Sequence, residues 1–190
     1  MNLTKQLQSY LPWNEQEKED REEICRALAL PDIFLRENRL AHMTASAWVA
    51  NPAADRVLMV WHNIYHSWSW LGGHADGETD LLSVAVREVE EESGIGGVRP
   101  LSEDIFSLEI LTVDGHEKRG LYVPSHLHLN VTYLLEADDT AAVTIKPDEN
   151  SGVAWFTPEE AVAASTEPWF QERIYTKLNR KLAAWAAARE

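Results

Sequence analysis

The stretch GGHADGETDLLSVAVREVEEESGI, residues 72–95, says most about how this chain folds and what it binds. It joins a glycine-rich turn to a helix that Thr79 is placed to cap and Gly94 is placed to end. Four of the five residues at positions 88–92 are glutamates. Like charges at helical spacing destabilise a helix by roughly 0.2–0.5 kcal/mol per pair. Such a concentration of charge beside a tight turn indicates a segment that binds a cation.

The expected helix, residues 80–93, carries two neighbouring faces of different chemistry. Four apolar side chains at positions i, i+3, i+4 and i+7 form a stripe expected to face the core: Leu82, Ala85, Val86 and Val89. Glu88, Glu91 and Glu92 repeat the i, i+3, i+4 spacing beside it, so their carboxylates are expected to converge. A set of oxygen ligands favours Mg²⁺ or Mn²⁺ over zinc. The plainer alternative is an acidic, solvated helix after a glycine turn.

This segment resembles the signature of the Nudix hydrolases. That signature is a glycine, five residues, a glutamate, seven residues, Arg-Glu, an aliphatic residue, any residue, Glu-Glu, any residue, glycine and an aliphatic residue. Residues 87–95, REVEEESGI, match the second half at every position. In the first half Gly73 occupies the glycine position, but Thr79 stands where the family has its glutamate, and Glu78 lies one residue early. Either Glu78 still takes that role, or another group orients Arg87.

The resemblance implies a hydrolase that uses Mg²⁺, or Mn²⁺, to cleave the diphosphate linkage of a nucleoside diphosphate joined to another moiety. It implies that Glu88, Glu91 and Glu92 bind the metal and that Glu88, Glu91 and Arg87 serve catalysis. The general base is expected either on this helix or at Glu149, which follows a later turn and has a solvated role as its plainer reading. Substrate-binding residues are expected at four positions: Gly72, Gly73, His74 and Glu78.

Other histidines and aromatic residues near the turn have less specific roles. His126 and His128 alternate along an expected strand and should point to one face of the sheet. Trp68 or Trp70 could stack on a nucleobase, although core packing is the commoner role for tryptophan. His74, within the turn itself, is therefore the histidine that we expect to contact substrate.

Composition narrows the class of partner. The 190-residue chain has a formal net charge of −14, which disfavours binding to nucleic acid or to an anionic membrane. The expected partner is instead a small nucleotide diphosphate derivative, screened by metal ions. The single cysteine, Cys25, permits no intrachain disulfide, and the N-terminus carries no apolar signal region, so a cytoplasmic location is expected.

The order of expected elements predicts an α/β (α+β) fold of the Nudix type, in which a mixed sheet lies between helices. Residues 1–40 are expected to form an N-terminal helical extension, and residues 41–190 the Nudix domain with its C-terminal helix. Residues 114–124, rich in Gly, His, Lys and Arg, are expected to form a loop. A homodimer is compatible with the extension, by analogy with other folds.

Two other functions are compatible with parts of the sequence. An enzyme similar to isoprenoid-diphosphate isomerases would share the fold but would need a cysteine near the site, and Cys25 lies far upstream of the strands. A non-catalytic nucleotide-binding regulatory module would be expected to have lost the metal-binding glutamates, which this sequence retains.

Overall fold

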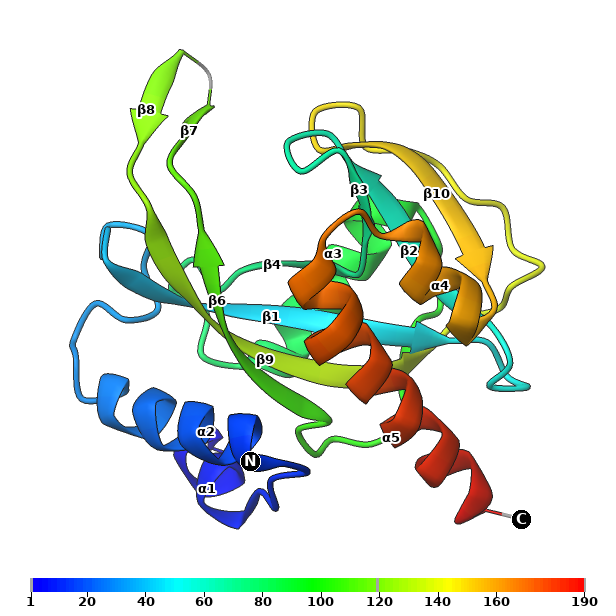
Figure 1. Ribbon diagram of the computed structural model, residues 1–190, viewed down its shortest axis with the longest axis horizontal. Coiled ribbons are helices and arrows are strands. Elements are labelled where there is room, and N and C mark those ends of the chain that lie inside the picture. Colours follow the sequence, from blue (N-terminus) through cyan, green and yellow to red (C-terminus); the bar gives the residue numbers. More distant parts are fainter. Residues whose placement is uncertain (1, 119, 190) are drawn as a thin grey trace.

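The computed structural model describes residues 2–118 and 120–189, and its centre is a curled, mixed β-sheet (Figure 1). Its long central strands β1 (Ala41–Ala50) and β9 (His126–Glu136) pair in parallel, whereas the other strand pairs of this sheet are antiparallel. The main path runs β10-β2-β1-β9-β5, with β3 on β2, β4 on β1 and β6 on β9. The remaining strands of this sheet are β2 (Val57–His62), β3 (Ser67–Ser69), β4 (Leu71–His74), β5 (Arg99–Pro100), β6 (Ser107–Val113) and β10 (Asn150–Phe156).

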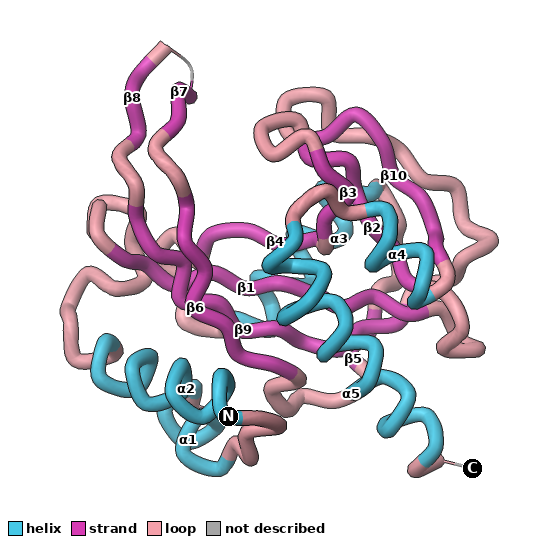
Figure 2. Tube along the Cα trace, viewed as in Figure 1, coloured by secondary structure: helices cyan, strands magenta, loops and turns pink. Residues whose placement is uncertain are grey.

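Helices cover both faces of the sheet, as the tube view also shows (Figure 2). Alternate residues of β1 enter different cores: Met43 and Ala45 pack with α3, whereas Trp48 and Ala50 pack with α5. The mixed sheet between helices confirms the fold class predicted from the sequence. The helices are α1 (Leu3–Ser9), α2 (Glu15–Ala27), α3 (Leu81–Ser93), α4 (Pro158–Ala164), the π-helical turn η1 (Phe170–Tyr175) and α5 (Thr176–Ala187).

A buried ionic network joins the first helices to the last one. Glu17 on α2 is fully buried and lies 2.8 Å from Lys181 and 3.3 Å from Lys177, both on α5. Lys177 also lies 2.9 Å from Glu109 of β6, and Tyr10 donates its hydroxyl proton to Glu17 over 2.6 Å. Although burial opposes ionisation, the charges of Lys177 and Lys181 lower the pKa of Glu17. The network therefore holds the N-terminal helices against β6 and α5 with its charges paired.

Helix α3 begins one residue later than the sequence suggested. Asp80, not Thr79, is its N-cap and accepts a hydrogen bond from the Ser83 N–H. The buried side chains of the helix are accordingly Leu81, Val84, Ala85, Val89, Glu92 and Ser93, while Leu82 and Val86 are only partly buried. The helix ends as expected at Gly94, whose φ of 69° is the left-handed conformation that glycine adopts without strain.

Residues 114–124 are not simply a loop. Strands β7 (His116–Lys118) and β8 (Leu121–Val123) form an antiparallel hairpin that extends β6 and β9 away from the body of the molecule (Figure 1). Its register, with His116 opposite Val123, continues the pairing of β6 with β9. Within the described residues no helix is long and apolar enough to cross a membrane.

Candidate active site

The Gly72-Gly73 turn lies directly against the glutamates of α3. The Gly72 N–H donates to the Glu92 carboxylate over 3.0 Å. A Cβ at Gly73 would fall 2.5 Å from the carboxyl carbon of Glu88, and one at Gly72 would fall 2.5 Å from the backbone oxygen of Ala45. Glycine is therefore needed at position 72, where the backbone of β1 comes close, whereas a Cβ at position 73 would displace the Glu88 carboxylate.

Two of the three glutamates are withdrawn from solvent. Glu92 is only 5% exposed, and burial raises its pKa to about 8 despite the hydrogen bond from Gly72. Burial also raises the pKa of the half-buried Glu88, with a smaller contribution from the charge of Glu91, although Arg87 acts in the opposite direction. Both side chains thus sit where negative charge is costly unless a cation is close.

Glu91 is exposed and points toward a second segment of the chain. Its carboxylate lies 3.2 Å from Lys146, which also lies 3.0 Å from Glu149. Partial burial opposes the charge on Lys146, but hydrogen bonds to Glu149 and Glu91 raise its pKa overall. Asn150 fixes this segment by donating to the Glu92 carbonyl over 2.9 Å. The structure therefore brings Glu149 beside the helix, with Lys146 between them.

Arg87 and Glu78 do not contact one another among the hydrogen bonds and ion pairs of the described residues. Arg87 lies 3.0 Å from Glu88 and 3.7 Å from Glu91. Glu78 turns back on the start of α3 and accepts from the N–H groups of Thr79 and Asp80, over 2.7 and 2.8 Å. The glutamates of α3 thus orient Arg87.

A cavity of about 200 Å³ opens onto these groups. Five carboxylates line it, from α3, from the turn before β10 and from the segment before η1: Glu88, Glu92, Asp148, Glu149 and Glu167. Asn130 of β9 also lines it, held by hydrogen bonds of 2.9 Å from the hydroxyls of Thr44 and Ser46. Asn130 gave no signal in the sequence, because its place opposite Thr44 depends on the register of β1 with β9.

A second cavity, of about 460 Å³, adjoins the first and shares His74 and His128 with it. Apolar and aromatic side chains of the β7–β8 hairpin and the turn after β2 line it, including Leu121, Tyr122 and Tyr65. By contrast, Trp68 packs against Trp61 and Phe156. Trp70 packs edge-on against Phe170 and Tyr175, although it also reaches the first cavity.

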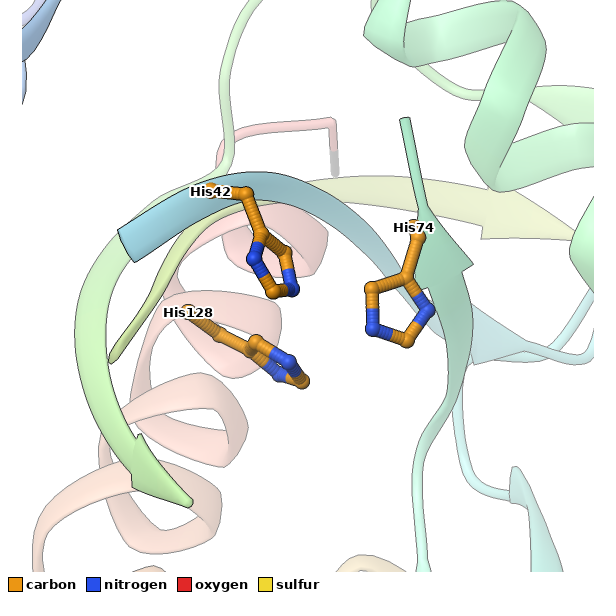
Figure 3. A group of neighbouring side chains, drawn as sticks. All are labelled: His42, His74 and His128. Atoms are coloured by element: carbon orange, nitrogen blue, oxygen red, sulfur yellow. The ribbon is translucent and has the colours of Figure 1, made fainter. Parts of the chain in front are cut away.

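Histidines from three adjacent strands meet where the two cavities join. Figure 3 shows the rings of His42 (β1), His74 (β4) and His128 (β9) turned toward a common space. The parallel register sets His42 opposite His128, and the antiparallel register sets His74 opposite Thr44, two residues along β1 from His42. Burial, reinforced by the rings of His74 and His42, lowers the pKa of His128 to about 2. The sequence suggested His74 alone, because strand register cannot be read from the spacing of residues.

One family of known proteins matches most of the chain. The sequence model described as the NUDIX domain matches residues 40–178. The chain belongs to the NUDIX domain family. This membership confirms the resemblance drawn from residues 87–95 and, with the carboxylate-lined cavity, supports an enzyme that hydrolyses a pyrophosphate bond. Comparison with curated protein sequences gives no significant match.

Solved structures share this Nudix fold at low sequence identity. An Ap4A hydrolase of C. elegans, in a binary complex, is 21% identical, with a TM-score of 0.56 over 77% of this chain and 98% of that one. A NUDIX-family hydrolase of Clostridium perfringens is 20% identical, with a TM-score of 0.51 over 76% and 97%. The E. coli dihydroneopterin triphosphate pyrophosphohydrolase is 14% identical, with a TM-score of 0.50 over 71% and 92%.

Cys25 bears on the isomerase alternative. It lies exposed on α2 and lines neither of the two cavities described above. An isomerase of the kind considered above would need a cysteine at the reacting atoms, so the position of Cys25 favours the Nudix hydrolase assignment.

Proposed function

We propose that this protein is a metal-dependent Nudix hydrolase that cleaves the diphosphate linkage of a nucleoside diphosphate joined to another moiety. The observation that carries the proposal is the cavity where Glu88 and Glu92 meet the Gly72-Gly73 turn. A chain of net charge −14 would repel a diphosphate, so bound cations are needed to bring substrate to these carboxylates.

The residues present fit a hard divalent cation. Glu88, Glu91 and Glu92 offer only carboxylate oxygens, the donors that Mg²⁺ and Mn²⁺ prefer. Glu92 is buried with a raised pKa, as expected of a carboxylate whose counter-charge is not supplied by the protein. We propose Glu88, Glu91 and Glu92 as the metal ligands and Mg²⁺, with Mn²⁺ as an alternative, as the ion.

When bound, such an ion lowers the pKa of a coordinated water and offsets negative charge on the phosphates. The chain itself supplies the rest of the machinery. Arg87 holds the carboxylates of Glu88 and Glu91 in place through the contacts described above. Glu149, which lines the cavity, is proposed to accept the proton of the attacking water.

Substrate binding is proposed to use the turn and the second cavity. Gly72 and Gly73 line the first cavity beside Glu88 and Glu92, where a phosphate is proposed to bind, and His74 lies where the two cavities meet. Glu78 is proposed to shape the turn through its bonds to the N–H groups that begin α3. A cavity of about 460 Å³ suits a drug-sized or nucleoside-sized group. Tyr65 and Tyr122 there could stack on a nucleobase.

The test is a panel of nucleoside triphosphates, nucleotide sugars and dinucleoside polyphosphates, assayed with Mg²⁺ or Mn²⁺ and resolved by product. Glu91→Ala is the informative variant because Glu91 is exposed, so its loss should leave the fold intact. We expect at least one substrate to be cleaved at its diphosphate, with a rate for Glu91→Ala lower by about 10²–10³.

Glu90→Ala is the matched control, since Glu90 is exposed on the same helix outside the proposed ligand set. It should retain full activity. Equal rates for the wild type and Glu91→Ala would rule out catalysis by this helix. A loss in Glu149→Gln smaller than tenfold would instead assign the general base to a glutamate of α3.

A further inference from the structure

Three histidine ring nitrogens converge at the junction of the two cavities. One ring nitrogen from each of His42, His74 and His128 lies within 4.8 Å of the others. The rings are in mutual contact, with centroids 4.9–5.1 Å apart. Each ring comes from a different strand of one sheet, which fixes the three backbone positions relative to one another (Figure 3). The pairing of the strands therefore sets the arrangement of the three histidines.

His42 supplies an independent sign that a ligand belongs here. It is only 4% exposed, and its Nε2 is buried without a hydrogen-bond partner. Its other nitrogen, Nδ1, lies 3.0 Å from the backbone oxygen of Asn38, so it carries the proton and donates it. Nε2 therefore presents a lone pair. A buried polar atom left unpaired is destabilising, and a bound cation would remove that cost.

The surroundings resemble those of histidines that bind metals. Ligating histidines usually donate their second ring N–H to a carbonyl or carboxylate, as His42 does to Asn38. His128 contacts His126 through the two Nε2 atoms at 3.1 Å, and His126 is held in turn by the Pro124 carbonyl at 2.9 Å. Arg36 lies nearby and forms an ion pair with Asp76, so its positive charge repels a bound cation less than an unpaired arginine would.

The donor set selects the kind of ion. Three neutral imidazoles suit Zn²⁺ and its neighbours among the transition metals, whereas Mg²⁺ requires oxygen ligands. Zn–N bonds of about 2.1 Å place tetrahedral ligands about 3.4 Å apart, so the rings would draw together slightly on binding. Three histidines leave a fourth position open, and His74 and His128 also line the cavity of the carboxylates.

We propose that His42, His74 and His128 form a second metal site, selective for Zn²⁺ and separate from the carboxylate site on α3. Its fourth position faces the junction of the two cavities, where a water or a substrate phosphate oxygen can occupy it. His126 is a positioning residue that holds the ring of His128. The site does not depend on the proposed hydrolase activity, and its test reads metal binding directly.

The experiment uses the full chain, stripped of metal by a chelator and dialysed. Titration with Co²⁺ should give the visible absorption of a tetrahedral Co²⁺ complex, and one equivalent of Zn²⁺ should abolish it while millimolar Mg²⁺ should not. X-ray absorption at the zinc edge should show imidazole ligands. His42→Gln is the main variant, because it preserves bulk at a buried site that does not line the carboxylate cavity. It should weaken Zn²⁺ binding by on the order of 100-fold or more.

His116→Gln is the matched control, since the His116 ring is 6.5 Å from His126 and outside the three ligands. It should bind Zn²⁺ as the wild type does. Glu91→Ala should also retain the site. The proposal is overturned if the wild type binds no Zn²⁺, if His42→Gln binds it equally, or if the absorption spectrum of the wild type shows oxygen ligands alone. The spectrum needs no variant, so a misfolded His42→Gln would not prevent the test.

Discussion

Two buried glutamates of this molecule, Glu17 and Glu92, have opposite electrostatic surroundings. Glu17 has Lys177 and Lys181 within 3.3 Å, and their charges lower its pKa. Glu92 has a single backbone N–H at 3.0 Å, and burial raises its pKa to about 8. A buried charge whose partners are all supplied by the chain belongs to the architecture. Glu92 has no such cationic partner in direct contact among the described residues, and we propose that a bound metal ion supplies its counter-charge.

The largest expected effect comes from removing the paired carboxylate. Glu17→Ala would leave Lys177 and Lys181 buried without their shared partner, so we expect a loss of about 3–5 kcal/mol in the free energy of unfolding. Urea denaturation at neutral pH measures it. Glu23→Ala is the control, because Glu23 is exposed on the same helix and its ion pair with Arg26 should contribute within about 0.5 kcal/mol. Similar losses in both variants would mean that the buried Glu17 matters no more to stability than an exposed glutamate of the same helix.

A smaller effect is expected from neutralising the unpaired carboxylate. The raised pKa of Glu92, about 8, means that the folded, metal-free protein resists its ionisation. Protonated Glu92 therefore contributes to the free energy of unfolding. This contribution is complete below the ordinary glutamate pKa near 4.5 and is lost as the pH rises toward 8. Relative to Glu92→Gln, which keeps an acceptor for the Gly72 N–H, the wild type should therefore lose on the order of a few kcal/mol across that window.

Urea denaturation of both proteins in chelator, at a series of pH values, measures this difference. Adding Mg²⁺ at pH 8 should restore the wild type and leave Glu92→Gln unchanged. Parallel pH profiles for the two proteins would show that burial does not hinder the ionisation of Glu92. The contrast between Glu92 and Glu17 would then be lost.

The smallest effect is expected at Glu78, an exposed carboxylate whose partners are backbone N–H groups. Glu78→Ala removes its two hydrogen bonds to the start of α3 and should cost roughly 0.5–1 kcal/mol of stability. Hydrolysis rates should stay within about tenfold of the wild type, and Glu78→Gln should recover the stability. A hundredfold loss of rate in Glu78→Ala would show instead that Glu78 serves as the glutamate that the signature places at position 79.

The proposed carboxylate site could be predicted from the sequence because its parts are local. Glu88, Glu91 and Glu92 lie within one helix, and helical spacing alone relates them. The same reasoning misjudged the phase of that helix by about one residue, because Thr79 and Asp80 are both good caps and only the fold chooses Asp80. The core stripe consequently centres on Leu81 and Val84, and it continues through Glu92.

Features that depend on contacts between distant segments could not be predicted from the sequence. His42 meets His128 only because β1 and β9 pair in parallel with one particular register. The ionic partners Glu17 and Lys181 are 164 residues apart, so no local spacing of charged residues relates them. The β7–β8 hairpin was not predicted because residues 114–124 lack the alternation of apolar and polar residues that predicts strands.

The parallel pairing of β1 with β9 also sets the order of events during synthesis. Its partners, such as Thr44 and Asn130, are separated by 86 residues, so the centre of the sheet cannot close until the ribosome has released most of the chain. The first helices wait longer still, since Lys177 and Lys181 lie on α5, which is made after β9. A nascent chain of this protein therefore holds an unpaired Glu17 and an open strand edge until α5 emerges, and a chaperone has most to protect before that point.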